Sequence, residues 1–130
     1  MFDTWYTSKA MLTTLNNYGY PYVCMIKNNR KVMYNNRIKL DVKTISLLFN
    51  KKQFRYYSGT GFYIKAIEVT IPGIGKVKLA IVKNGYNATI QNTKFIITNI
   101  LDTPAQEIVK KYLNRIFIFY FSANTTDKKR

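Results

Sequence analysis

The chain has 130 residues, 47% of them hydrophobic, which is enough apolar material for one folded domain and excludes an intrinsically disordered chain. Twenty-one Lys and Arg against six Asp and Glu give a net charge of +15. This excess favours a polyanionic partner, with a lysine-rich solvated surface as the alternative. The absence of histidine excludes Ser-His-Asp catalysis and histidine-ligated zinc, and the single cysteine excludes an intrachain disulfide.

The first predicted elements form a strand–helix–strand unit. Residues 1–5 are typical of the end of a strand, and Thr7 or Ser8 can cap a helix that Gly19 ends from the C′ position. Residues 20–27 form an apolar, β-rich run whose cysteine is expected to be buried and inert. This order predicts an α/β unit with a parallel strand pair.

The middle of the chain is predicted to be rich in β structure. Residues 31–40 are β-like, and Asp41 then caps a short helix that turns Ile45, Leu48 and Phe49 inward. Further strands are expected at 54–58, 61–71 and 76–83.

Two turn signals follow in the same region. Residues 72–75, Pro-Gly-Ile-Gly, are typical of a hairpin loop and lack the spacing of a phosphate-binding loop, although Lys76 follows them. Asn84-Gly85 predicts a type I′ turn. One more strand is expected at 94–98.

The last predicted helix has the clearest boundary signals. Thr103 and Gln106 form a capping box, and Pro104 suits the first helical position. Tyr112 and Arg115 are expected to lie beside the core face of this helix. That core face is expected to consist of Val109, Leu113, Ile116, Phe117 and Tyr120.

The spacing of Tyr112, Arg115 and Phe119 places the three residues on one stripe of this helix. A tyrosine hydroxyl and a guanidinium on one stripe suit a phosphate backbone. The position one turn beyond the arginine suits a metal-binding carboxylate, but Phe119 occupies it and offers no oxygen donor. Packing of aromatic residues in a core is the alternative interpretation of this stripe.

Three blocks of sequence carry a resemblance to a known family. They are Asp-Thr-Trp-Tyr-Thr-Ser at 3–8, Ile-Lys-Asn-Asn-Arg-Lys-Val at 26–32, and the segment 95–115 with Ile-Ile-Thr-Asn and Tyr-Leu-Asn-Arg. In this order, with a β-rich middle, the blocks resemble DDE transposases of prokaryotic insertion sequences. The resemblance is to the insertion-sequence-four group, which has a Tyr-Arg-Glu-Lys signature.

The resemblance implies an α/β (α+β) fold, namely part of an RNase H-like transposase core with a β-rich insertion. Residues 1–30 would belong to the core, 31–93 to the insertion with one short helix, and 94–121 to the returning core with the signature helix. Residues 122–130 would be a disordered tail. Phe-Ser-Ala-Asn at 121–124 is what a frameshift would make of the family's Phe-Phe-Arg-Glu, so we expect a frameshifted tail.

In that family three carboxylates hold two divalent ions, which activate the attacking oxygen and stabilise the leaving oxygen in DNA cleavage and strand transfer. By resemblance, Asp3 is the second catalytic, metal-binding acid, and Tyr112 and Arg115 are the DNA-binding pair. Phe119 stands in place of the third acid, Thr126 in place of the signature lysine, and the first acid would lie upstream of this sequence. The implied cofactor is Mg²⁺ or Mn²⁺, but with one acid of three we expect the chain alone to be catalytically inactive.

The implied partners are the DNA of transposon ends and other transposase chains. No secretory signal is visible, and the longest apolar run, 116–121, is far shorter than a membrane span, so we expect a cytoplasmic protein with no membrane partner. One alternative is a non-catalytic, basic DNA-binding module that regulates transposition. Another is a decayed product that does not fold stably.

Overall fold

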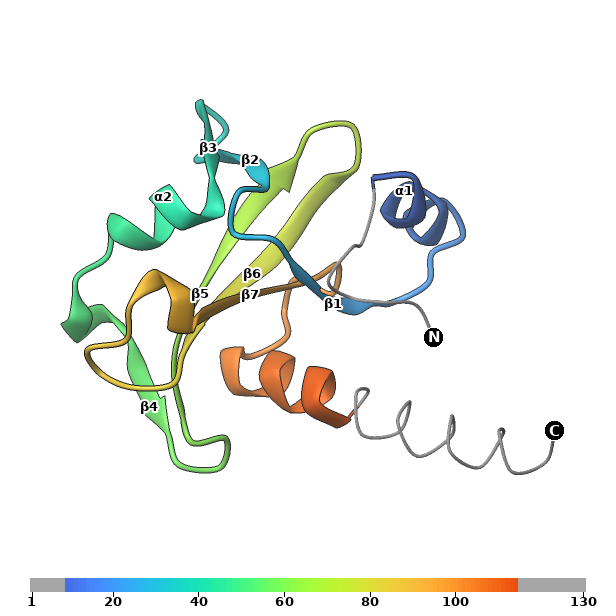
Figure 1. Cartoon of the computed structure of the whole chain (residues 1–130). Helices are drawn as coiled ribbons and strands as arrows, with labels where there is room; N and C mark the ends of the chain where they lie inside the picture. Colours follow the sequence, from blue (N-terminus) through green and yellow to red (C-terminus); the bar gives the residue numbers. More distant parts are fainter. Residues whose placement is uncertain (1–8, 115–130) are drawn as a thin grey trace, which may run out of the picture.

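The computed structural model describes residues 9–114, which form one curled antiparallel sheet with helices on both sides (Figure 1). The strands are β1 (Val23–Ile26), β2 (Lys31–Tyr34), β3 (Ile38–Asp41), β4 (Arg55–Tyr57), β5 (Phe62–Ile71), β6 (Gly75–Lys83) and β7 (Thr93–Thr98). The helices are α1 (Lys9–Asn17), α2 (Val42–Leu47) and helix 105–114, with 3-10 turns η2 (Lys51–Gln53) and η3 (Ile90–Asn92). The predicted mixture of α and β structure is confirmed.

The strands lie in the order β1-β7-β6-β5-β2-β3, and every strand pair within residues 9–114 is antiparallel. One edge of β5 pairs with two strands, with β4 near its start at Phe62 and with β2 near its end at Thr70. The parallel pair expected in the first unit involves residues 1–5, which lie outside the described residues.

The longest hairpin joins β5 and β6, which pair from Tyr63 opposite Lys83 to Ile71 opposite Gly75. The hairpin loop predicted at 72–75 is confirmed. At its tip Gly73 has a φ of 81°, a left-handed conformation that favours glycine. Alternation along these two strands sends side chains to both faces of the sheet, and each face carries a core.

One face of the sheet packs against α1 and α2. Leu12 of α1 and both Val42 and Ile45 of α2 are fully buried in this core. Asp41 caps α2 as predicted, since its carboxylate accepts a 2.8 Å hydrogen bond from the backbone N–H of Thr44. Hydrogen bonds from Thr44 hold the pKa of the Asp41 carboxyl below its usual value. The strands contribute Cys24, Ile26, Val32, Val69, Val77, Leu79, Ile81, Phe95 and Ile97 to this core.

Helix 105–114 covers the opposite face of the sheet, on the other side from α1 and α2 (Figure 1). Its buried residues Ile108, Val109 and Tyr112 pack in a second core. Leu113, predicted to be in the core face, is instead 42% exposed. The face is centred on Ile108 and Tyr112, and Leu113 points about 100° away from Tyr112 around the helix. The strand residues of this core are Val23, Ile64, Ala80, Val82 and Ile96.

Two local predictions in the middle of the chain need correction. The β-like run at 31–40 is divided into a hairpin, because Asn35 and Asn36 take left-handed φ values of 56° and 57° and turn the chain between β2 and β3. Leu48, predicted to point inward, is 55% exposed, because the buried face of α2 consists of Val42, Ile45 and Ser46.

The type I′ turn predicted at Asn84-Gly85 is wrong. Such a turn requires a positive φ at both central residues, and neither of these residues has one. The pairing of Lys83 with Thr93 explains the difference, since the connection between β6 and β7 runs over the whole of 84–92 and includes η3.

A single sheet joins the three predicted segments, with β1 from 1–30, β2 to β6 from 31–93, and all of β7 after Thr93 from 94–121. The segments also share a core, because Leu12, Val77 and Phe95 belong to the same buried cluster. No helix within residues 9–114 has the length and apolar character needed to cross a lipid bilayer.

Candidate nucleic-acid interface

Tyr112 is the one predicted site residue that lies within the described part of the chain. It is only 6% exposed, and its ring packs in the core between helix 105–114 and the sheet. Its hydroxyl lies 3.9 Å from Sδ of Met25 on β1. The sequence placed Tyr112 beside the core face, whereas the structure places its ring within that face. A phosphate contact by this residue stays a prediction.

The other residues that the resemblance singles out, namely Asp3, Arg115, Phe119 and Thr126, lie outside the described residues. Within residues 9–114 no group of three or more His, Cys, Asp or Glu side chains could hold a metal ion. The acids that the resemblance assigns to a Mg²⁺ or Mn²⁺ site do not lie within these residues, so that site stays a prediction and we derive no chemical step through a metal.

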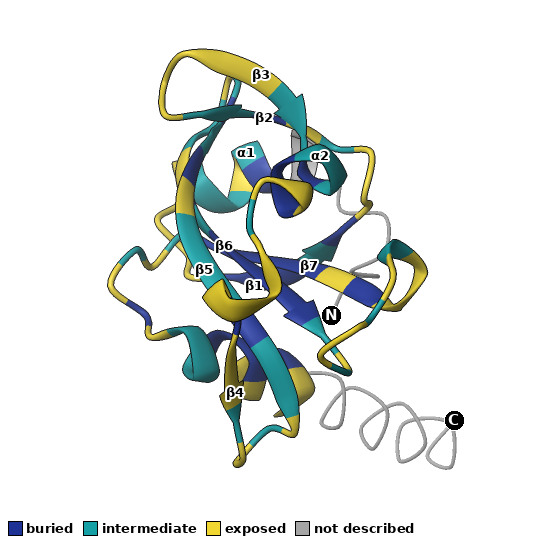
Figure 2. Cartoon of the chain, turned by 90° about the vertical axis from the view of Figure 1, so that its left-hand side faces the viewer, coloured by how far each residue is buried: buried dark blue, intermediate teal, exposed yellow. Residues whose placement is uncertain are grey.

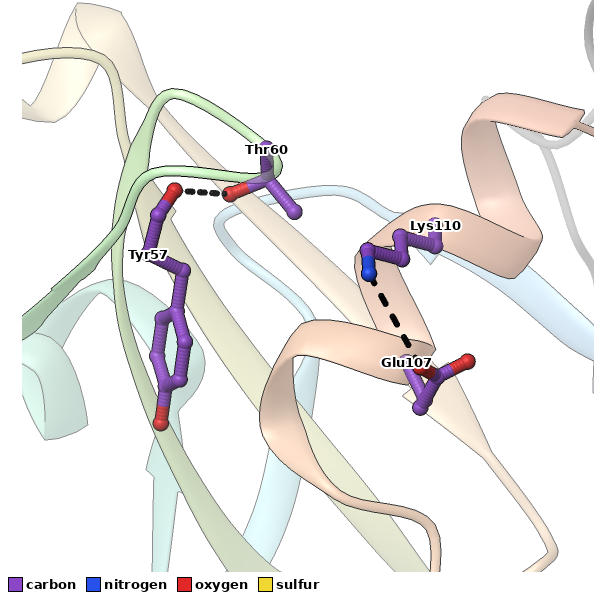
Figure 3. A network of polar contacts seen from close by, with 4 residues as sticks. All are labelled: Tyr57, Thr60, Glu107 and Lys110. Atoms are coloured by element: carbon purple, nitrogen blue, oxygen red, sulfur yellow. Dashed lines mark hydrogen bonds and ion pairs between the residues drawn. The ribbon is translucent and has the colours of Figure 1, made fainter.

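The β4–β5 hairpin lies against helix 105–114 at Lys110 (Figure 3). At the tip of the hairpin, Oγ1 of Thr60 donates a 3.0 Å hydrogen bond to the carbonyl of Tyr57. A Cβ atom added at Gly59 would lie 3.5 Å from Cε of Lys110. Nζ of Lys110 also lies 4.0 Å from Oε1 of Glu107, an exposed ion pair that contributes little stability. Lys110 therefore belongs to the contact between hairpin and helix.

The pairing of β1 with β7 brings the second and third sequence blocks side by side. Ile26, the first residue of the second block, lies opposite Phe95, the first residue of the third block. Because the two strands are antiparallel, the next residues beyond this pair are Lys27 on one strand and Lys94 on the other. Two exposed lysines thus lie together at one end of the strand pair.

A groove of about 200 Å³ lies at this end of the strand pair, and we call it the lysine groove. Its apolar lining comes from β1 and β7. Its polar lining combines ammonium groups and amides, which can donate hydrogen bonds to phosphate oxygens, with the buried hydroxyl of Thr93, which donates to the carbonyl of Thr89 at 2.8 Å. These polar residues are Lys27, Asn28, Gln91, Thr93 and Lys94.

Reasoning from sequence did not bring Lys27 and Lys94 together. Lys27 lies in a recognised block, but Lys94 was only the expected first residue of a strand. The signal that could have found the pair is the register of β1 against β7, which joins residues far apart in the chain. Apolar alternation predicts that each run is a strand and does not say which partner it takes.

Comparison with known proteins gave no match to a family model, a curated protein or a solved structure. The family assignment therefore depends on the three sequence blocks and on the pairing of β1 with β7.

Proposed function

We propose that this chain is a fragment of a DDE transposase of the insertion-sequence-four group that binds DNA and does not cleave it by itself. In this proposal it holds DNA, in the cytoplasm, through basic surface residues. Residues 1–30 and 94–121 belong to the RNase H-like core and 31–93 to an insertion.

The observation that carries the proposal is the pairing of β1 with β7. An insertion that leaves a core and returns to it must begin and end at neighbouring points. The pair Ile26 and Phe95 supports this, because these residues lie opposite each other in the two core segments that flank 31–93. The same pairing sets Lys27 of the second block beside Lys94, the residue before the third block, at the lysine groove.

The charge of the chain supports a nucleic-acid partner. The net charge is +15, and Asp and Glu are absent from the whole of 69–101, the segment that supplies Gln91, Thr93 and Lys94 to the groove. Neutralisation of phosphates by lysines releases counterions, and this release is the main source of affinity for duplex DNA at low salt.

The proposed lack of cleavage rests on the third catalytic acid. By resemblance Phe119 stands at the position of this acid, and phenylalanine cannot ligate a metal. Arg115 would contact the phosphate backbone as a cation, since a guanidinium offers several donors to phosphate oxygens. Without the third acid, the chain would occupy transposon ends without completing strand transfer.

The proposal is tested by fluorescence anisotropy with a labelled duplex of about 20 base pairs, titrated between about 50 and 200 mM salt. We expect the logarithm of the association constant to fall linearly with the logarithm of the salt concentration. The double variant Lys27→Gln/Lys94→Gln should bind more weakly, and its slope should be smaller by about 2 because two phosphate contacts are lost.

The matched control is Lys39→Gln/Lys111→Gln, which removes the same charge from exposed positions on β3 and helix 105–114. We expect this control to keep a slope closer to that of the wild type. If both double variants lost the same affinity and the same slope, the binding would depend on net charge and not on the lysine groove. No binding of duplex at the lowest salt concentration would contradict the proposed function itself.

A second candidate function is a regulator that is derived from a transposase and acts without catalysis. The net charge of +15 and Phe119 at the position of the third acid favour this role as much as that of a broken enzyme. Co-purification with a full-length transposase of the same group, followed by loss of its strand-transfer activity, would support the regulator.

A further inference from the structure

Three tyrosines gather around the β4 end of the sheet, and we call them the tyrosine cluster. Tyr56 on β4 lies opposite Tyr63 on β5, and their ring centroids are 5.0 Å apart. The ring of Tyr86, in the connection after β6, lies 5.8 Å from that of Tyr63. Tyr56 is 51% exposed and Tyr86 is 43% exposed, and most of β4 is drawn as exposed in Figure 2.

Lysines border the tyrosine cluster. Nζ of Lys51 lies 5.8 Å from the ring centroid of Tyr86, and the same ammonium group donates a hydrogen bond to Oδ1 of Asn87. Lys83 lies opposite Tyr63 in the β5–β6 hairpin, with Nζ 4.1 Å from the ring centroid of Phe54. Burial and the nearby charge of Lys51 lower the pKa of Lys83. The two ammonium groups therefore repel each other across this surface.

Carboxylates are missing from the chain segments that build this surface. Asp and Glu are absent from 42–67, which contains Lys51, Tyr56 and Tyr63. They are also absent from 69–101, which contains Lys83 and Tyr86. A bound anion would relieve the repulsion between the lysines, so the charge of the surface suits an anionic partner.

We propose that the tyrosine cluster is a stacking platform for the unpaired bases of single-stranded nucleic acid. Exposed rings can stack on bases of any sequence, while neighbouring lysines attract the phosphates that link them. Tyrosine suits this task because it has a large apolar ring and only two side-chain torsions to immobilise. Bases in a duplex stack on one another and cannot offer their faces to these rings, so the occupant must be single-stranded.

The platform rests on the proposed nucleic-acid function and deepens it by naming the form of nucleic acid. One segment of chain links the platform to the lysine groove. The connection 84–92 carries Tyr86 at the platform and Gln91 at the groove. A strand that leaves a duplex held at the groove would meet the platform along this connection.

The experiment measures the binding of a labelled oligothymidine of about 12 nucleotides by fluorescence anisotropy, beside the duplex titration. Tyr56→Ala/Tyr86→Ala should weaken oligonucleotide binding by about tenfold or more, because two stacking rings are lost. Tyr56→Phe/Tyr86→Phe keeps both rings and should bind within about twofold of the wild type. Binding of the duplex should change little in either variant.

The chain offers a matched control in a second exposed pair of tyrosines. Tyr18 and Tyr20 are 71% and 58% exposed, and their ring centroids lie 5.9 Å apart, but they follow α1, away from β4. Tyr18→Ala/Tyr20→Ala should leave oligonucleotide binding unchanged, and thermal melting should show that all variants fold.

The possible failures are distinguishable. If Tyr56→Ala/Tyr86→Ala binds the oligonucleotide as tightly as the wild type while the duplex still binds, the platform is refuted and the proposed function stands. If neither nucleic acid binds the wild type, both proposals are refuted. If Tyr56→Ala/Tyr86→Ala and Tyr18→Ala/Tyr20→Ala weakened oligonucleotide binding equally, the platform would also be refuted. Any exposed pair of tyrosines would then contribute to binding.

Discussion

Asn99 holds the start of β1 in place through Tyr22: its Oδ1 accepts a 3.0 Å hydrogen bond from the backbone N–H of Tyr22. Its Nδ2 donates to the carbonyl of Tyr20 at 2.9 Å and approaches Oδ1 of Asn16 at 3.4 Å. Asn16 in turn donates to the carbonyl of Ile74 in the β5–β6 hairpin loop. One asparagine side chain thus links the end of β7, the start of β1 and the end of α1.

Replacement of Asn99 should therefore destabilise the fold. In Asn99→Ala the backbone N–H of the buried Tyr22 loses its acceptor, and we expect unfolding to become easier by about 2–3 kcal/mol. Asn99→Asp keeps an acceptor for this N–H but loses the donor to Tyr20, so it should cost less. Urea denaturation measures both values. A change of less than about 0.5 kcal/mol in Asn99→Ala would contradict the role given to this network.

Local signals in the sequence predicted much of the fold. Asp41 caps α2 as its type and position indicate. The apolar runs at 61–71 and 76–83 became β5 and β6 with small changes of boundary. These elements were predictable because each depends on residues close together in the sequence. The signals are the alternation of apolar and polar residues along a strand, the capping residue of a helix and the glycine of a tight turn.

Strand partners were not predictable, because they depend on contacts between distant residues. Nothing local to Lys27 indicates that Lys94 is its neighbour, and nothing local to Tyr63 indicates Tyr86. The turn expected at Asn84-Gly85 shows the same limit, since the register of β6 against β7 overrides a strong local preference. The candidate site predicted from resemblance depends on Asp3 and Arg115, which lie outside the described residues.

Tyr22 carries a buried hydroxyl that finds no hydrogen-bond partner among the described residues. Burial raises the pKa of Tyr22 to about 12. In Tyr22→Phe the orphan hydroxyl is removed while the ring is kept, so we expect stability at neutral pH to be unchanged or higher by about 1 kcal/mol. Clear destabilisation would show that the hydroxyl has a partner after all.

The raised pKa of Tyr22 also predicts a difference between wild type and Tyr22→Phe in alkaline solution. Ionisation begins first in the unfolded chain, whose tyrosine has the ordinary pKa of 10.0. The wild type keeps the full contribution of the neutral phenol below this pH and loses it as the pH rises through about 12. The stability of the wild type should fall relative to the variant by up to about 3 kcal/mol over this range. If the free energy of unfolding depended on pH in the same way in both proteins, the raised pKa of Tyr22 would be contradicted.

Gly19 ends α1 in the left-handed conformation, with a φ of 69°. Its N–H donates to the carbonyl of Asn16 at 3.0 Å, and the N–H of Tyr20 donates to that of Leu15 at 2.9 Å, as in a Schellman motif. A Cβ at Gly19 would meet nothing within 4 Å, so the cost of Gly19→Ala is conformational alone. We expect a loss of about 1 kcal/mol in chemical denaturation.

The control for this prediction is Gly85→Ala. A Cβ at Gly85 would also lie in open space, but Gly85 lacks a positive φ, so its replacement should be neutral or stabilising by about 0.5 kcal/mol. A similar loss in both variants would mean that backbone conformation does not explain the effect at Gly19.

Substitutions of Tyr112 separate packing from a contact with DNA. Because the ring is 6% exposed in the core under helix 105–114, Tyr112→Ala should cost about 3–5 kcal/mol in the free energy of unfolding. Tyr112→Phe keeps the buried ring and loses the 3.9 Å contact between the hydroxyl and Sδ of Met25, so it should melt within a few degrees of the wild type. For the same reason we expect it to bind duplex DNA within about twofold of the wild type. A loss of tenfold with unchanged melting would place the hydroxyl on a phosphate and would support the role that the transposase resemblance gives to this residue.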